Sequence, residues 1–188
     1  MNRTRRRMLV RTVLVLLVFT AVGAACGYLW AEIWDPATGV VIDHTWYPSP
    51  WETGQQAQFD ATGWYVVIAA AAGLVLGLLA ALIAAGSELV MLVTVLLGSL
   101  LGAWTMRWVG LAQGPPDPQH LAASLPDNST LPSAMELWGP ATWLAFPFGA
   151  MLALTIVFLL LGRTRLPEEP GPGHAAAAGS DAEPVTHG

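Results

Sequence analysis

Charged side chains are the groups of this chain that could move protons or ions, and they avoid the middle of its long apolar runs. Four such runs occur, at residues 12–30, 64–85, 89–112 and 138–162. Arg107, near the end of the third run, is the only charged residue within any of them. Charged groups at the centre of a membrane helix are the usual mark of a proton or ion pathway. The sequence therefore argues against an ion-coupled pump.

Histidine, cysteine and carboxylate side chains show no spacing that would build a catalytic or metal site. His44 follows Asp43, but a metal site needs three or four ligands that converge. The single cysteine, Cys26, excludes an intramolecular disulfide. Walker, dinucleotide-binding, nucleophile-elbow and His-Glu-x-x-His motifs are absent from the sequence. We therefore predict no catalytic, cofactor-binding or metal residues, no cofactor, and a protein that is not an enzyme.

The composition indicates a membrane protein. Of the 188 residues, 54% are hydrophobic and only 11% are charged, whereas soluble domains carry about 25% charged residues. Each apolar run can cross roughly 30 Å of hydrocarbon as a helix that rises about 1.5 Å per residue. A helix is required because backbone groups find no water in lipid. We predict an all-α membrane protein with four transmembrane helices, at about residues 11–34, 64–86, 88–112 and 138–163.

The remaining residues are predicted to form two loops and a tail around one membrane domain, residues 1–165. The loops, 35–63 and 113–137, lie on the same side of the membrane. The tail, residues 166–188, is rich in proline, glycine and alanine without an apolar period, so we predict that it is disordered. All eight basic residues are arginine, which, with the abundance of alanine and glycine, suggests a bacterial chain from a GC-rich genome.

Arginine placement predicts that both termini are cytoplasmic. Seven of the eight arginines precede the first helix or follow the fourth, and cytoplasmic segments of membrane proteins carry an excess of basic residues. The two loops then lie outside, with Arg107 as their only basic neighbour. The predicted location is the cell membrane, in multi-pass topology.

Tryptophan gathers on the predicted outer side, where all nine residues lie at or beyond helix ends. Two interpretations stay open: an anchoring belt at the headgroup level, or a small aromatic-rich cap built by the outer loops. Residues 39–43 and 56–60 contain β-branched or alternating residues, which suggests a short β-hairpin within such a cap. Prolines in the second loop exclude regular structure beyond one helical turn near residues 120–124.

Small residues spaced by four mark the helix faces that could pack closely, because close backbone approach favours helix association in lipid. The second helix carries such a ridge and the third carries a pair, and a short turn at residues 86–88 joins them. We predict that these two faces meet in a hairpin that forms the stable core. The alternative is that the ridge binds a second copy of the chain. The residues are Gly73, Gly77, Ala81, Gly98 and Gly102.

Arg107 is the residue most expected to organise the outer side. It lies near the outer end of the third helix, between Trp104 and Trp108. One interpretation is an interfacial anchor whose guanidinium reaches water. We favour an ion pair with a carboxylate at the same depth, which would tie the helix to the outer loops. The candidate partners are Glu32, Asp35, Asp60 and Glu136.

Four phrases of loop and helix-end residues occur in order among the four spans: TGVVIDHTWYP, TGWYVV, GPPDP and WLAFPFGA. In these phrases the chain resembles small multi-pass membrane proteins of actinobacteria that belong to uncharacterised families. The resemblance covers about residues 8–162. It implies a four-helix membrane protein with no established activity and no functional residues to carry over.

The expected function is that of a non-enzymatic accessory or interaction protein, because aromatic and acidic residues concentrate outside and no catalytic pattern accompanies them. Its expected partners are the lipid bilayer and either another membrane protein or a second copy of itself, with no nucleic acid. The alternative is a subunit of a small channel or transporter, which would need a continuous polar cavity through the helices. An enzyme ranks third, since it would need carboxylates or a histidine converging in an outer cleft.

Overall fold

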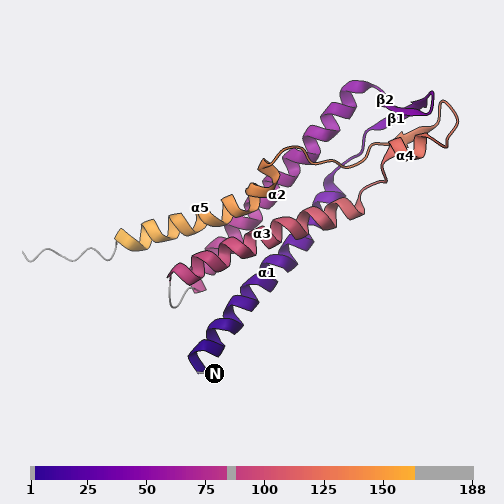
Figure 1. Cartoon of the computed structure of the whole chain (residues 1–188). Helices are drawn as coiled ribbons and strands as arrows, with labels where there is room; N and C mark the ends of the chain where they lie inside the picture. The colour runs from indigo at the N-terminus through magenta and orange to yellow at the C-terminus, as the bar shows by residue number, and fades with distance from the viewer. Residues whose placement is uncertain (1–2, 84–87, 164–188) are drawn as a thin grey trace, which may run out of the picture. The chain divides into compact units, whose positions relative to one another are not determined.

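Helices dominate the part of the chain that the structure describes, a computed structural model of residues 3–83 and 88–163 (Figure 1). The elements in chain order are α1 (Arg3–Ile33), β1 (Thr38–Ile42), β2 (Thr45–Pro48), α2 (Trp51–Ile83), α3 (Glu88–Gln113), α4 (Pro118–Ala122), β3 (Thr130–Pro132) and α5 (Ala141–Arg163). The chain comprises two compact units, Met1–Val157 and Phe158–Gly188. Of the second unit, only the last residues of α5 are described. The predicted disordered tail and most of the predicted turn at 86–88 lie outside the described residues.

Four helices, α1, α2, α3 and α5, are long and apolar enough to cross a membrane. This confirms the prediction of four helices with the length and composition of membrane spans. Leucine and valine side chains remain exposed on all four, for example Leu17 on α1 and Leu82 on α2. Such surfaces suit hydrocarbon as the surrounding solvent, because exposed apolar area is unfavourable in water.

The helix α2 begins at Trp51, so the predicted loop through residue 63 and the predicted strand at 56–60 are wrong. Pro50 precedes the helix, and its carbonyl accepts hydrogen bonds from the N–H and the hydroxyl of Thr53, at 3.2 and 2.6 Å. The helix extends beyond the apolar run because one face of the extension is buried by tertiary contacts, which hydropathy does not report. The buried residues of the extension are Gly54, Ala57 and Ala61.

Two other helix boundaries differ from the predicted ones. The helix α1 begins at Arg3 instead of residue 11, since arginine is a good helix former and a helix need not stop where hydrocarbon stops. The helix α5 begins at Ala141 instead of residue 138. Gly139 has a positive φ of 82°, which interrupts the helical path, and the helix starts after Pro140.

The predicted two-stranded hairpin is in fact a three-stranded antiparallel sheet with the order β2–β1–β3. The strand β1 pairs with β2, immediately after it, across a two-residue turn formed by Asp43 and His44. Their φ values of 49° and 59° are those of a type I′ turn, whose twist matches that of paired strands. The strand β3 pairs with the other edge of β1. Asp43 and His44, considered above as a weak metal motif, therefore serve as the hairpin turn.

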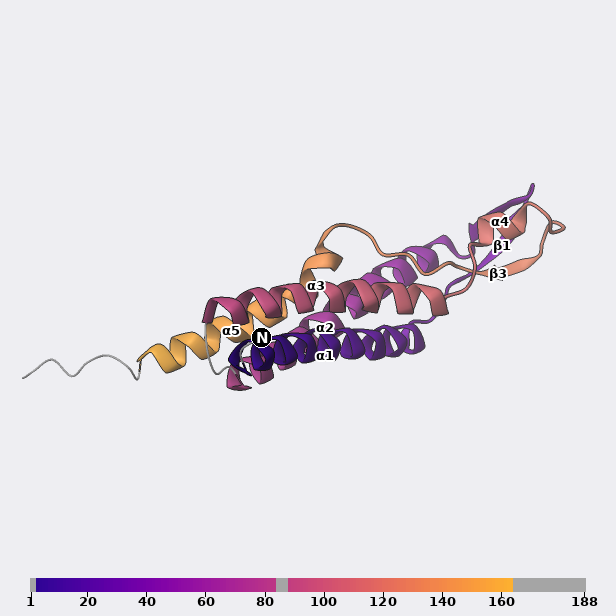
Figure 2. The ribbon, with the colours of Figure 1, turned by 60° about the horizontal axis from the view of Figure 1, so that its bottom comes forward.

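Two pairs of helices approach closely through small residues. A Cβ atom added at either of two glycines of α1 would collide with the backbone of α3, and the same holds for two glycines of α2 and the backbone of α5. In each pair the contacts advance along both helices in the same direction, so the paired helices are parallel. Figure 2 shows α1 lying alongside α3. The contacts are Gly23 with Gly102, Gly27 with Met106, Gly73 with Phe146, and Gly77 with Ala150.

The prediction that the glycine faces of α2 and α3 meet each other is therefore wrong. Gly98 of α3 faces the ring of Phe19, which lies 3.1 Å from an added Cβ, and Gly102 lies against Phe19 and Phe146. Ala81 is only half-buried. Spacing of four identifies a face that can approach another backbone, but the small residues of α1 and α5 decide which helix that is.

Candidate functional site

Buried aromatic donors fasten α1 to the extension of α2. The indole N–H of Trp30 donates to the carbonyl of Ala61 at 2.8 Å, and that of Trp34 donates to the carbonyl of Ala57 at 2.9 Å. Both tryptophans are buried, with exposed fractions of 0% and 7%. A buried indole needs an acceptor, and the acceptors lie one helical turn apart on α2, as the donors do on α1. The spacing therefore fixes the register of the two helices.

Tyr65 extends these contacts to a third helix. Its ring meets that of Trp30 edge-to-face, with centroids 5.2 Å apart and an interplanar angle of 79°. Its hydroxyl donates to the carbonyl of Ala103 on α3 at 3.1 Å. Since edge-to-face pairs are favoured over stacked ones and the hydroxyl is satisfied, Tyr65 joins α2 to both α1 and α3.

The sheet is held to α4 by side chains that bond to strand backbone. The indole N–H of Trp46 donates to the carbonyl of Leu131 on β3 at 3.2 Å. The side-chain amide of Gln119 on α4 accepts from the N–H of Trp46 at 3.4 Å and donates to its carbonyl at 3.0 Å. Asp117 caps α4 by accepting from the N–H of Gln119 at 2.9 Å. Gln119 thus covers the edge of β2, which would otherwise present unpaired backbone groups.

The nine tryptophans divide between the two interpretations left open by the sequence. Trp30 and Trp34 are buried, and Trp46 is half-buried with its N–H bonded to backbone; these three hold helices and strands together. The other six are exposed, as membrane anchors would be. The exposed residues are Trp51, Trp64, Trp104, Trp108, Trp138 and Trp143.

Arg107 contacts an aromatic ring. Its guanidinium carbon lies 5.3 Å from the centroid of the Trp143 ring on α5, which is cation–π geometry. Among the described residues, none of the four predicted carboxylates forms an ion pair with Arg107, so this structure contradicts the predicted tie to a carboxylate. The ring of Trp143 lies on the neighbouring helix and satisfies the cation without the cost of desolvating a second charge. The four carboxylates, Glu32, Asp35, Asp60 and Glu136, are all exposed, and Glu136 accepts from the indole N–H of Trp138 at 3.3 Å.

Polar side chains within the membrane-type helices bond to the backbone of their own helix. Thr94 donates to the carbonyl of Val90 at 2.7 Å, and Thr105 donates to that of Leu101 at 2.8 Å. Throughout the described residues, every buried side-chain nitrogen or oxygen has a partner. The same residues contain no group of three or more histidine, cysteine, aspartate or glutamate side chains that could hold a metal ion. In the described part of the chain, therefore, polar groups do not converge on a reaction centre.

The sequence could have revealed part of this arrangement. Trp30 and Trp34 are four residues apart, as are Ala57, Ala61 and Tyr65, so each set lies on one helix face. That pairing required residues 51–63 to be helical, which the apolar pattern did not indicate. Gln119 gave no signal, because an exposed glutamine in a proline-rich loop has no characteristic spacing. Comparison of the chain with protein-family models, with curated proteins and with solved structures finds no match.

Proposed function

We propose that this chain is a non-enzymatic multi-pass membrane protein that acts as an accessory or interaction partner through its sheet region. The sheet region comprises residues 34–63 and 114–138, which contain β1–β3, α4 and the extension of α2. Simple connections between membrane helices need only a few residues, whereas these segments form a hydrogen-bonded sheet fixed to α1 and α2. Large aromatic side chains remain exposed on it, and such groups are enriched where proteins bind one another. They are Tyr47, Trp51 and Phe59, with exposed fractions of 51%, 58% and 78%.

The proposal places the sheet region outside the cytoplasm, with both termini inside. Its support is the arginine count, since segments rich in arginine stay cytoplasmic. Single cysteines at positions 55 and 120, in a background with Cys26 replaced by serine, are expected to react with a membrane-impermeant thiol reagent in intact cells. A cysteine at position 175 is expected to react only after the cells are lysed. Labelling of position 175 in intact cells would reverse the orientation.

Site-specific photocrosslinking tests the interaction role. A photoreactive phenylalanine analogue in place of Phe59 is expected to give a discrete protein adduct on illumination of native membranes. The matched control is the same analogue in place of Leu82, which lies near the other end of α2 and is 69% exposed. We expect no adduct there. An adduct at Leu82 but not at Phe59 would contradict the sheet region as the interaction surface and favour the channel or transporter subunit, whose contacts would run through the helix faces.

A further inference from the structure

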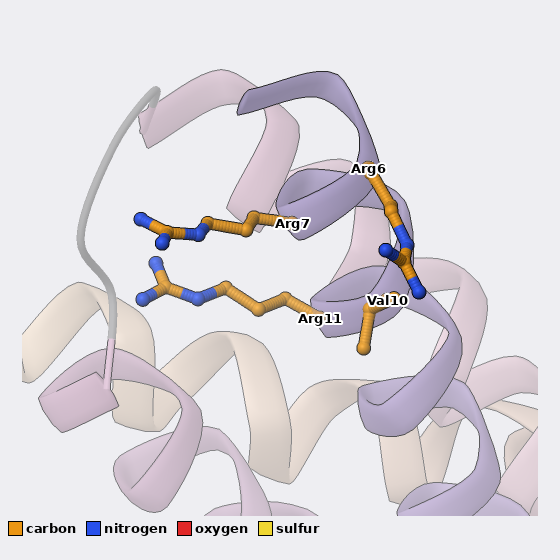
Figure 3. Close-up of a pocket in the computed structure, with 4 residues that line it drawn as sticks. All are labelled: Arg6, Arg7, Val10 and Arg11. Atoms are coloured by element: carbon orange, nitrogen blue, oxygen red, sulfur yellow. The ribbon is translucent and has the colours of Figure 1, made fainter. Parts of the chain in front are cut away.

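An open basic hollow lies at the start of α1. Its described lining consists of Arg6, Arg7, Val10 and Arg11, and its volume is about 730 Å³. Figure 3 shows the side chains of Arg7 and Arg11 extending side by side in the same direction, with their guanidinium groups close together, while Arg6 lies near Val10. Three guanidinium groups therefore border a space large enough for a polar headgroup.

This arrangement of charge is unfavourable for the helix on its own. Arg7 and Arg11 are four residues apart, and like charges at this spacing destabilise a helix. The N-terminal end of a helix also carries a partial positive charge, which further disfavours cations there. The first turn of α1 contains no acidic residue to offset them. An anion held between the guanidinium groups would relieve both effects.

We infer that this hollow binds the phosphate group of an anionic phospholipid. Guanidinium groups bind phosphate oxygens through paired, forked hydrogen bonds, which suits Arg7 and Arg11 as a clamp. A lipid is favoured over a free phosphate ion because an apolar surface begins beside the hollow. Leu9, Val13 and Leu14 are 50%, 52% and 58% exposed along the next turns of α1, where acyl chains would lie. The inference depends neither on the partner role nor on the orientation proposed above.

Native mass spectrometry of the full-length protein in detergent tests this site. Phosphatidylglycerol and phosphatidylcholine with the same acyl chains would be titrated, and the dissociation constants compared. Phosphatidylglycerol is expected to bind more tightly. The variant Arg7→Gln/Arg11→Gln should weaken its binding about 25-fold, since each basic residue near an anionic membrane surface contributes about fivefold. Binding of phosphatidylcholine should be unchanged by the variant.

The matched control is Arg5→Gln, which removes one charge from the same turns without removing a residue that lines the hollow. Its effect is expected to stay within about twofold, because exposed charges outside the site are screened. If Arg7→Gln alone weakens binding no more than Arg5→Gln, attraction is diffuse and the site is overturned. Displacement of phosphatidylglycerol by inorganic phosphate at millimolar concentration would also overturn the lipid assignment. If the double glutamine variant does not fold, Arg7→Lys/Arg11→Lys keeps the charge, loses the forked donors and should still weaken binding about fivefold.

Discussion

Replacing Gly77 by alanine is expected to destabilise the protein by about 1–3 kcal/mol, the usual cost of overpacking, and to lower its melting temperature in detergent. A Cβ atom at this position would lie 2.8 Å from the Cα atom of Ala150 and 3.0 Å from its carbonyl carbon. Because these are backbone atoms of α5, no side chain can rotate away and the two helices must separate. Separation is costly since close packing, not the hydrophobic effect, holds membrane helices together.

Gly63 provides a control within the same helix. An added Cβ there would meet nothing within 4 Å, and alanine is favoured over glycine in helices by about 0.8–1.0 kcal/mol. Gly63→Ala should therefore leave the melting temperature unchanged or raise it. Gly98→Ala should have an intermediate effect, because the ring of Phe19, which lies 3.1 Å from an added Cβ, can shift. Equal melting temperatures for all three variants would show that α2 does not pack on α5 as described.

The contrast between Gly77 and Gly98 shows how far small-residue spacing can be interpreted from sequence. Spacing of four placed Gly73 and Gly77 on one face of α2, and Gly98 and Gly102 on one face of α3, and the structure buries all four. The partners were assigned wrongly because the short turn between α2 and α3 suggested that neighbours in sequence pack most closely. Parallel packing of α1 on α3 and of α2 on α5 depends on complementary small residues in other helices. A periodicity defines a face but carries no information about the face opposite.

The same distinction explains the remaining differences. The four spans followed from length and hydropathy, which depend on each segment alone. The extension of α2 did not, because its polar residues, such as Gln55 and Gln58, conceal a buried stripe that exists only against Trp30 and Trp34. Arg107 could be placed near a helix end, but a carboxylate and an aromatic ring satisfy a guanidinium equally well on chemical grounds. Only the packing of α3 against α5 selects Trp143.

Replacing Trp30 by alanine is expected to cause the largest loss of stability, about 3–5 kcal/mol, as for other large-to-small changes of buried aromatic residues. The Trp30 side chain is fully buried. Its ring packs on Tyr65 and on Gly110, where an added Cβ would collide with it, and its N–H is bonded to the carbonyl of Ala61. The variant would leave a cavity among three helices, because the backbone at Gly110 cannot collapse into it without moving α3. Thermal unfolding in detergent and protease resistance of residues 34–63 would measure the effect.

Two further variants separate the volume of Trp30 from its hydrogen bond and from its residue type. Trp30→Phe keeps one ring but removes the indole N–H, and should cost about 1–2 kcal/mol, less than the alanine variant. Trp108→Ala removes the same side chain from a position that is 64% exposed, and should change stability by no more than about 0.5 kcal/mol. If Trp108→Ala is as harmful as Trp30→Ala, then anchoring by tryptophan in general stabilises the fold. If it is not, stability depends on the buried contact that joins α1, α2 and α3, and the sheet region is held in place by that contact.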